Sequence, residues 1–126
     1  MKLSYTVCLL LAFLQPSIAI PEKRADDPAT IAWVKAMAHR MVKNGESYNC
    51  LAAIIDLESE WDYEAENPNS GSYGLFQALP PNKMASAGGD WKTNPETQLE
   101  WGLGYIRDRH RTACAAWKHL KENGWW

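Results

Sequence analysis

Apolar residues recur at helical spacing in four stretches of this chain, and local capping signals mark where most of them begin. Asp27-Pro28 offers an N-cap carboxylate followed by a proline, which suits the first turn of a helix. We expect this first helix to stop at Gly45, because glycine is favoured just past a helix end. Its apolar positions repeat every three or four residues: Ile31, Val34, Met37, Ala38 and Met41.

Three further helices are predicted downstream. One covers about residues 48–60, and the next follows Asn94-Pro95, again a cap with a first-turn proline. The last begins at Thr112 and closes near Gly124. The helix after Asn94-Pro95 would pack through apolar residues, with small residues allowing close backbone approach: Leu99, Leu103 and Ile106, and Gly102 and Gly104.

The stretch between the second and third helices lacks helical periodicity. Residues 66–72 are rich in Asn, Pro, Ser and Gly, which favour turns. Residues 72–79 suit a short strand or hairpin arm, and residues 80–91 are predicted to be irregular. We therefore expect a mostly helical α+β domain with two lobes and a central groove between them.

The N-terminal residues indicate export. A basic start, an apolar run over residues 3–14 and small residues at positions 17 and 19 match a signal peptide over residues 1–19. The alternative, a buried helix of the folded domain, is less favoured, and the run is shorter than the roughly 20 residues that span a bilayer. The dibasic pair Lys23-Arg24 either ends a pro-segment over residues 20–24 or occurs by chance, and residues 25–126 would form the catalytic domain.

Charge argues against one class of partner. The chain has 13 Lys and Arg against 15 Asp and Glu, a formal net charge of −2, so electrostatic capture of nucleic acid is not expected. The basic run over residues 107–111 is interpreted as a solvated helix end. We expect a secreted, extracellular monomer with no stable membrane anchor.

The cysteines also suit a secreted protein. Cys8 would leave with the signal peptide, and Cys50 and Cys114 would remain. An even pair in a secreted domain favours a disulfide. Two free buried thiols are the alternative, which the secretory context makes less favourable.

The second predicted helix carries an unusual carboxylate. Leu51, Ile54 and Ile55 share one face, and Glu58 falls on that face while Asp56 points to the opposite side. Partial burial there would raise the pKa of the Glu58 carboxyl group and keep it protonated, as a proton donor to a glycosidic oxygen must be. The alternative is a solvated or capping Glu, which is also the ordinary interpretation of Glu60 and Glu64.

Other chemistries have little support. The sequence has no His-Glu-x-x-His, no Cys-x-x-Cys, no nucleophile elbow and no glycine-rich phosphate loop, so we expect neither a metal nor another cofactor. Seven tryptophans exceed what a small core requires. Several flank loops or chain ends, where they would suit stacking on sugars or ordinary packing equally well: Trp61, Trp91, Trp101, Trp125 and Trp126.

Two ordered motifs resemble the lytic transglycosylase (SLT-type) signature of the lysozyme-like superfamily. Leu57-Glu58-Ser59-Glu60-Trp61 resembles its helix-ending Glu-Ser pair, and residues 67–77, which end in Tyr-Gly-Leu-Phe-Gln, resemble its Gly-x-x-Gln segment. The likeness continues to residue 126, and this later stretch is similar to compact secreted transglycosylase domains of actinobacteria. It implies a lysozyme-like fold and a peptidoglycan substrate.

The resemblance also implies roles for individual residues. Glu58 matches the catalytic acid/base, and Ser59 matches the residue that orients the Glu58 carboxylate or its water. Gln77 and Tyr73 match the wall of the substrate cleft, and Tyr105 matches the tyrosine of the third motif. Cys50 and Cys114 match a cysteine pair of the relatives, which supports the disulfide.

The implied reaction cleaves the β-1,4 bond between N-acetylmuramic acid and N-acetylglucosamine with one catalytic Glu and assistance from the substrate's N-acetyl group. Asp62 and Asp90 are weak candidates for a helper acid. Three residues depart from the family pattern, which usually has Arg, Gly and Pro at their positions: Leu57, Glu60 and Phe76. The alternatives to an enzyme are a non-catalytic sugar-binding module and a secreted toxin or effector that uses the fold as a scaffold.

Overall fold

The computed structural model describes residues 24–126, and its first two helices follow the capping signals with one correction. Helix α2 covers Pro28–Met41, with Asp27 at the N-cap position but without a side-chain cap hydrogen bond. Helix α3 covers Gly45–Ser59. Gly45 therefore opens α3, and the prediction that it ends the first helix was wrong. The reason is local, because the Asn44 side chain caps α3 by accepting a hydrogen bond from the Ser47 N–H at 3.0 Å.

The two later helices agree with their predicted starts. Helix α4 covers Pro95–His110, and the Asn94 side chain accepts a hydrogen bond from the Glu96 N–H at 3.0 Å. Helix α5 covers Ala113–Asn123, and the Thr112 hydroxyl accepts one from the Ala115 N–H at 3.1 Å. Gly124 follows α5 in the left-handed region at φ 77°. These caps confirm the prediction because each depends on residues within a few positions of one another.

The segment between α3 and α4 turns repeatedly and does not form the predicted strand. Among the described residues, its β-structure consists of isolated bridges that pair Tyr73 with Glu66 and with Ala78. Gly74 and Gln77 both have positive φ angles, which bend the chain within residues 72–79. A 3-10 helix, η1, covers Pro81–Ser86 inside the stretch predicted to be irregular.

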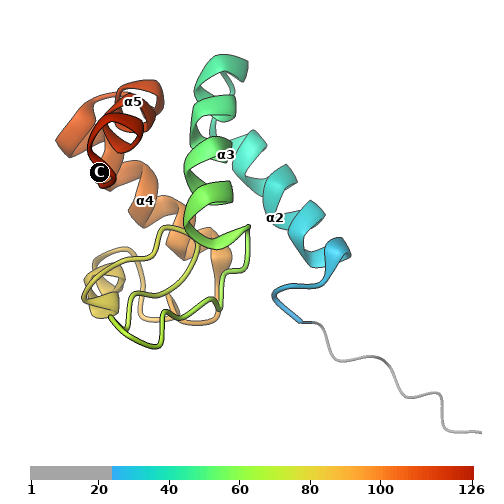
Figure 1. Cartoon of the computed structure of the whole chain (residues 1–126). Helices are drawn as coiled ribbons and strands as arrows, with labels where there is room; N and C mark the ends of the chain where they lie inside the picture. The colour runs from blue at the N-terminus through green and yellow to red at the C-terminus, as the bar shows by residue number, and fades with distance from the viewer. Residues whose placement is uncertain (1–23) are drawn as a thin grey trace, which may run out of the picture.

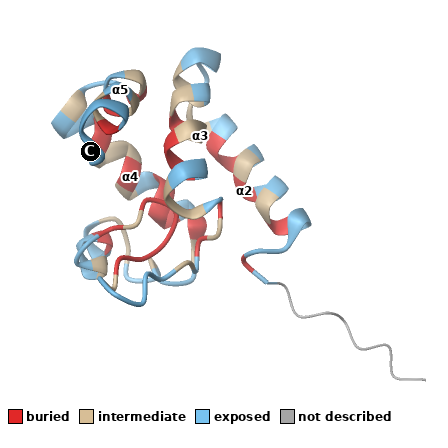
Figure 2. Ribbon diagram, viewed as in Figure 1, coloured by how far each residue is buried: buried red, intermediate tan, exposed pale blue. Residues whose placement is uncertain are grey.

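The described chain has two apolar clusters, and the larger one also takes in Trp61, Tyr63, Leu75 and Phe76 from the segment between α3 and α4. In Figure 1, α3 lies between α2 and α5, α4 runs behind them, and the segment between α3 and α4 forms the lower part of the molecule. Buried residues face inward from all four helices (Figure 2). The larger cluster joins the helices through residues such as Val34, Leu51 and Ile54, and the smaller one gathers Tyr73 and Met84 in the lower part. The mostly helical fold class is therefore confirmed.

A covalent link joins α3 to α5. Cys50 and Cys114 form a disulfide, with their Cα atoms 4.9 Å apart. This confirms the predicted bridge.

The close backbone approach predicted for α4 is right at one glycine. A Cβ atom on Gly102 would lie 2.1 Å from the ring of Phe76, so only glycine fits there without movement. At Gly104 a Cβ atom would meet only the end of the Arg107 side chain, at 3.4 Å. Gly104 is therefore not needed for close packing, contrary to the prediction.

The predicted signal peptide over residues 1–19 lies outside the described residues, as does most of the candidate pro-segment over residues 20–24. Within the part of the chain that the structure describes, no helix has the length and apolar character needed to span a bilayer.

Candidate functional site

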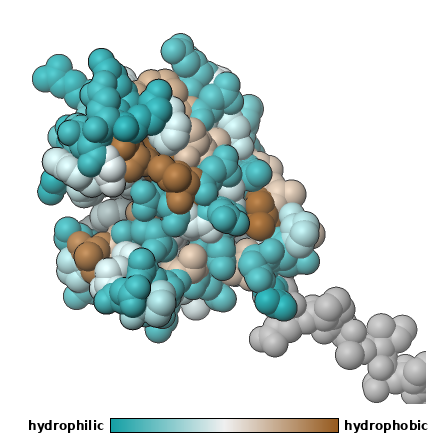
Figure 3. All heavy atoms as spheres, in the orientation of Figure 1, coloured by the Kyte–Doolittle hydropathy of each residue, from teal (hydrophilic) through white to brown (hydrophobic). Residues whose placement is uncertain are grey.

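A pocket of about 240 Å³ opens where the end of α3 meets three other parts of the chain. Its walls come from α3, from the segment before η1, from α4 and from the residues that follow α5. Figure 3 shows the surface indented on its left side, between the helical part and the lower part. The lining residues are Glu58, Phe76, Gln77, Ala78, Leu79, Lys83, Trp101, Tyr105, Gly124, Trp125 and Trp126. The central groove between two lobes stays a prediction.

Glu58 lies on the last turn of α3, on the face that the apolar spacing indicated. Leu51, Ile54 and Ile55 on that face are fully buried, and Glu58 is partly buried at the pocket wall. Burial raises the pKa of its carboxyl group, and a hydrogen bond from the Trp126 side chain lowers it in part. The net direction is upward, so the proton is held at a higher pH than an exposed Glu would allow.

Gln77 lines the same pocket and also holds the segment that forms one wall. Its backbone has a positive φ of 51°. Its side-chain amide donates to the main-chain oxygens of Ala65 and Gly74, both at 3.0 Å, and accepts from the Ser72 hydroxyl at 2.9 Å. With its amide oriented in this way, Gln77 fixes the loop wall beside Glu58.

Tyr105 approaches the pocket from α4. Its ring packs on Trp101 with centroids 5.2 Å apart, and its hydroxyl donates to the main-chain oxygen of Trp126 at 3.4 Å. Arg109 lies over the same ring at 4.9 Å. The structure thus brings Glu58, Gln77 and Tyr105 together around one cavity.

Ser59 and Tyr73 do not line this pocket. The Ser59 hydroxyl lies within hydrogen-bonding distance of the main-chain oxygens of Ile55 and Leu75, at 3.3 and 2.9 Å, and so joins the end of α3 to the loop. The buried Tyr73 donates to the Lys92 main-chain oxygen at 2.8 Å. Their contact with substrate stays a prediction, and the contacts described here support the loop.

Two residues of the site were not singled out from the sequence, and a third has a role that was not foreseen. Lys83 contributes a cation to the pocket wall from η1. Gln98, fully buried on α4, accepts from the Leu75 N–H and donates to the main-chain oxygens of Tyr63 and Trp91, all at 2.9 Å. Trp126, one of five candidates for sugar stacking, lines the same pocket as Glu58, and its side chain lowers the pKa of the Glu58 carboxyl group, an influence that the sequence did not indicate. A Gln within an apolar helix face could have identified Gln98 from the sequence, but no local pattern marks Lys83.

The five tryptophan candidates divide between the pocket and the rest of the molecule. Trp101, Trp125 and Trp126 line the pocket. Trp61 is buried in the core and donates its indole N–H to Asp56 at 2.6 Å, and Trp91 packs against Tyr73.

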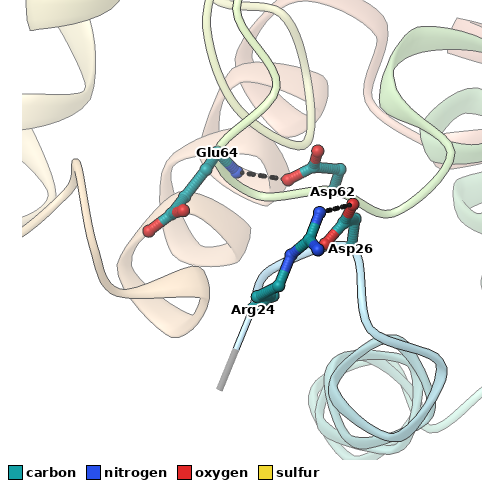
Figure 4. Close-up of polar contacts among 4 residues, drawn as sticks. All are labelled: Arg24, Asp26, Asp62 and Glu64. Atoms are coloured by element: carbon teal, nitrogen blue, oxygen red, sulfur yellow. Dashed lines mark hydrogen bonds and ion pairs between the residues drawn. The ribbon is translucent and has the colours of Figure 1, made fainter. Parts of the chain in front are cut away.

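The other carboxylates considered from the sequence lie away from the pocket wall. Asp62 accepts a hydrogen bond from the Glu64 N–H at 2.9 Å in the turn after α3, and Figure 4 shows this contact beside the Arg24–Asp26 pair. Hydrogen bonds from Asn94 and Thr97 lower the pKa of Asp90 and favour its charged form. Among residues 24–126, Glu58 is therefore the carboxylate side chain in this pocket.

Two departures from the expected family pattern acquire a physical context. Glu60 caps α3 in the left-handed region at φ 53°, a conformation that glycine adopts without strain. The causes that shift the pKa of Glu58 are burial and the Trp126 side chain, and Glu60 is not among them. Phe76 fills the space above Gly102 and lines the pocket.

No group of three His, Cys, Asp or Glu side chains within residues 24–126 is arranged to hold a metal ion. The residues at the pocket can hold a proton, offer aromatic faces and supply one cation.

Comparison with known proteins gives one match. The family model described as "Transglycosylase SLT domain" matches residues 35–121, which include every helix of the pocket. Neither a search of curated proteins nor a search of solved structures found a match.

Proposed function

This chain belongs to the transglycosylase SLT domain family, and from that premise we propose that it cleaves peptidoglycan with Glu58 as its catalytic acid. Members of this family are lytic transglycosylases. The observation that carries the proposal is the partly buried Glu58 carboxyl group at the pocket wall, with a raised pKa. A carboxyl group kept protonated by burial is suited to protonate a leaving sugar oxygen.

The proposed bond is the β-1,4 link between N-acetylmuramic acid and N-acetylglucosamine. Glu58 would donate its proton to the glycosidic oxygen while the C1–O bond breaks, and the substrate's N-acetyl oxygen would stabilise the positive charge at C1. Glu58, now a carboxylate, would then take the proton of the attacking hydroxyl. Attack by the C6 hydroxyl of the same sugar gives a 1,6-anhydro end, and attack by water gives a reducing end.

The composition of the pocket supports a one-carboxylate reaction. The described carboxylates other than Glu58 that were considered as helpers, Asp62 and Asp90, are engaged in local hydrogen bonds outside the pocket. Trp101 and the exposed Trp125, which both line the pocket, offer aromatic faces for sugar contact. Lys83 offers a cation at the pocket wall that could pair with lactyl or peptide carboxylates of the substrate.

We further infer that the protein acts outside the cell as a monomer. The Cys50–Cys114 disulfide is compatible with an oxidising compartment, and the predicted signal peptide would direct the chain there. We propose foreign bacterial walls as the substrate, because a dibasic pair after a signal peptide is typical of processing in a eukaryotic secretory pathway.

The test is clearing of purified bacterial walls, followed by light scattering. We expect wild type to clear the suspension and Glu58→Gln to lose at least about a hundredfold in rate, because general acid catalysis contributes roughly that much. Glu60→Gln, an exposed change two residues away, is the matched control and should clear normally. Equal clearing by wild type and Glu58→Gln would eliminate the catalytic role, and binding without clearing by wild type would favour a binding module. Mass spectrometry of the released fragments then separates anhydro from reducing ends, which differ by one water.

A further inference from the structure

The residues after α5 return to the pocket instead of leaving the molecule. Gly124 adopts a left-handed conformation at φ 77°, and residues 124–126, the 124–126 segment, line the cavity that contains Glu58. Trp125 is 61% exposed, whereas Trp126 is partly buried against the larger apolar cluster. Both aromatic residues of the segment line the pocket, one of them largely exposed and the other packed against neighbouring rings.

Contacts from three other parts of the chain hold the 124–126 segment in place. His119 on α5 lies with its Nδ1 atom 2.8 Å from the Trp125 main-chain oxygen, and the two rings pack at 4.4 Å. The Trp126 ring packs against Phe76 at 5.6 Å and against Tyr105 at 5.1 Å, nearly perpendicular to the latter. The Tyr105 hydroxyl adds the hydrogen bond to the Trp126 main chain. An aromatic side chain packed on two sides has little freedom to reorient.

We propose that Trp126 is a positioning residue for Glu58: its indole N–H holds the Glu58 carboxyl group in one orientation at the pocket wall. The proposal rests on the proposed function of Glu58. The indole nitrogen can only donate a hydrogen bond, and a carboxyl group at the end of a helix has several rotamers open to it. A donor fixed by ring packing selects the rotamer that points into the cavity, so the acid is aimed before substrate arrives.

The proposed hydrogen bond would also affect the charge of Glu58. Burial raises the pKa of the carboxyl group, and the Trp126 side chain opposes that rise because it stabilises the carboxylate. The acid can therefore lose its proton to the leaving group more easily than burial alone would permit, and the resulting carboxylate has a partner when it acts as the base.

The test removes the indole N–H and keeps an aromatic ring at position 126. In Trp126→Phe the packing on Phe76 and Tyr105 is largely retained, and we expect kcat on solubilised glycan strands to fall on the order of tenfold with KM little changed. The pKa of Glu58, followed by carbon NMR of the labelled carboxyl group, should rise, and the alkaline limb of the kcat profile should move to higher pH. Trp117→Phe, on α5 outside the pocket, is the matched control and should change none of these.

A second measurement needs no change at Trp126. In the wild-type protein the indole proton resonance of Trp126 should titrate with the pKa of Glu58, and this titration should vanish in Glu58→Gln. An indole resonance that ignores the Glu58 titration would overturn the proposal, as would Trp126→Phe with wild-type kcat and an unmoved pKa. Failure of the proposed function is separate, because there Glu58→Gln would clear walls as well as wild type does.

Discussion

At the scale of single residues, the burial that suits Glu58 to proton donation also lowers the stability of the folded protein. Its carboxyl group is partly buried, and its pKa is raised above the ordinary value of 4.5, chiefly by desolvation. A raised pKa in the folded state means that stability is fully present below about pH 4.5 and is lost as the pH rises through the folded pKa. Above that range the raised pKa costs free energy of folding, because the folded site disfavours the carboxylate that the unfolded chain leaves in water.

Glu58→Gln should consequently be more stable than wild type at pH 7 and close to it at pH 4. Gln has nearly the same shape and carries no charge, so we expect a gain of roughly 1 kcal/mol and a Tm a few degrees higher at pH 7. Thermal unfolding followed by circular dichroism at the two pH values checks this, with Glu60→Gln as the exposed control. A difference between Glu58→Gln and wild type that does not depend on pH would contradict the assigned desolvation.

At the scale of elements, α4 shapes the loop wall of the pocket. The Gln98 side chain ties three loop main-chain groups to α4, and Gly102 leaves room for the Phe76 ring. Both residues lie on α4, but their partners lie more than twenty positions earlier or in the turn before the helix. The loop conformation is thus set by contacts with the helix rather than by strand pairing of its own.

A pair of glycine substitutions on α4 tests this packing. Gly102→Ala would place a Cβ atom 2.1 Å from the Phe76 ring, so the free energy of unfolding should fall by roughly 1–3 kcal/mol, as for other overpacked sites. Gly104→Ala meets only a flexible Arg107 tip and should raise it by up to about 1 kcal/mol, because alanine favours helix. Urea unfolding of the two variants gives both values. Equal effects at the two positions would show that Phe76 does not need the space.

At the scale of the whole molecule, the disulfide connects α3, which supplies Glu58, to α5, which leads into the 124–126 segment. Cys50 on α3 and Cys114 on α5 are 64 positions apart in the sequence. The bridge therefore links distant parts of a small domain, where a covalent restraint on the unfolded chain has a large effect.

Removal of both cysteines should lower the free energy of unfolding by about 4 kcal/mol, the loop-closure entropy for a crosslink of this span. Urea unfolding of Cys50→Ala/Cys114→Ala against wild type measures the change. Reductant should lower the Tm of wild type and leave that of the double variant unchanged. A wild-type Tm that stays unchanged after reduction, with both thiols titratable in the reduced protein, would contradict this contribution.

Much of the helical framework could be predicted from local patterns. Pro28, Pro95 and Thr112 begin or precede helices as expected, because a cap and the first turn lie within four residues of each other. Glu58 could be placed on the apolar face of α3 for the same reason, since helical periodicity fixes which residues share a face. The predicted start of α3 was wrong because Asn44 caps this helix, and Gly45 therefore opens α3 instead of ending the helix before it.

The sequence by itself determined the helices, the disulfide pair and the face of α3 on which the candidate acid lies. Only the tertiary structure decided which aromatic rings surround Glu58, that Lys83 and Trp126 join it, and that residues 72–79 bend around Gln98 instead of forming a strand. Periodicity and capping act between neighbours along the chain. The walls of a pocket are made by segments that meet only after the core has packed.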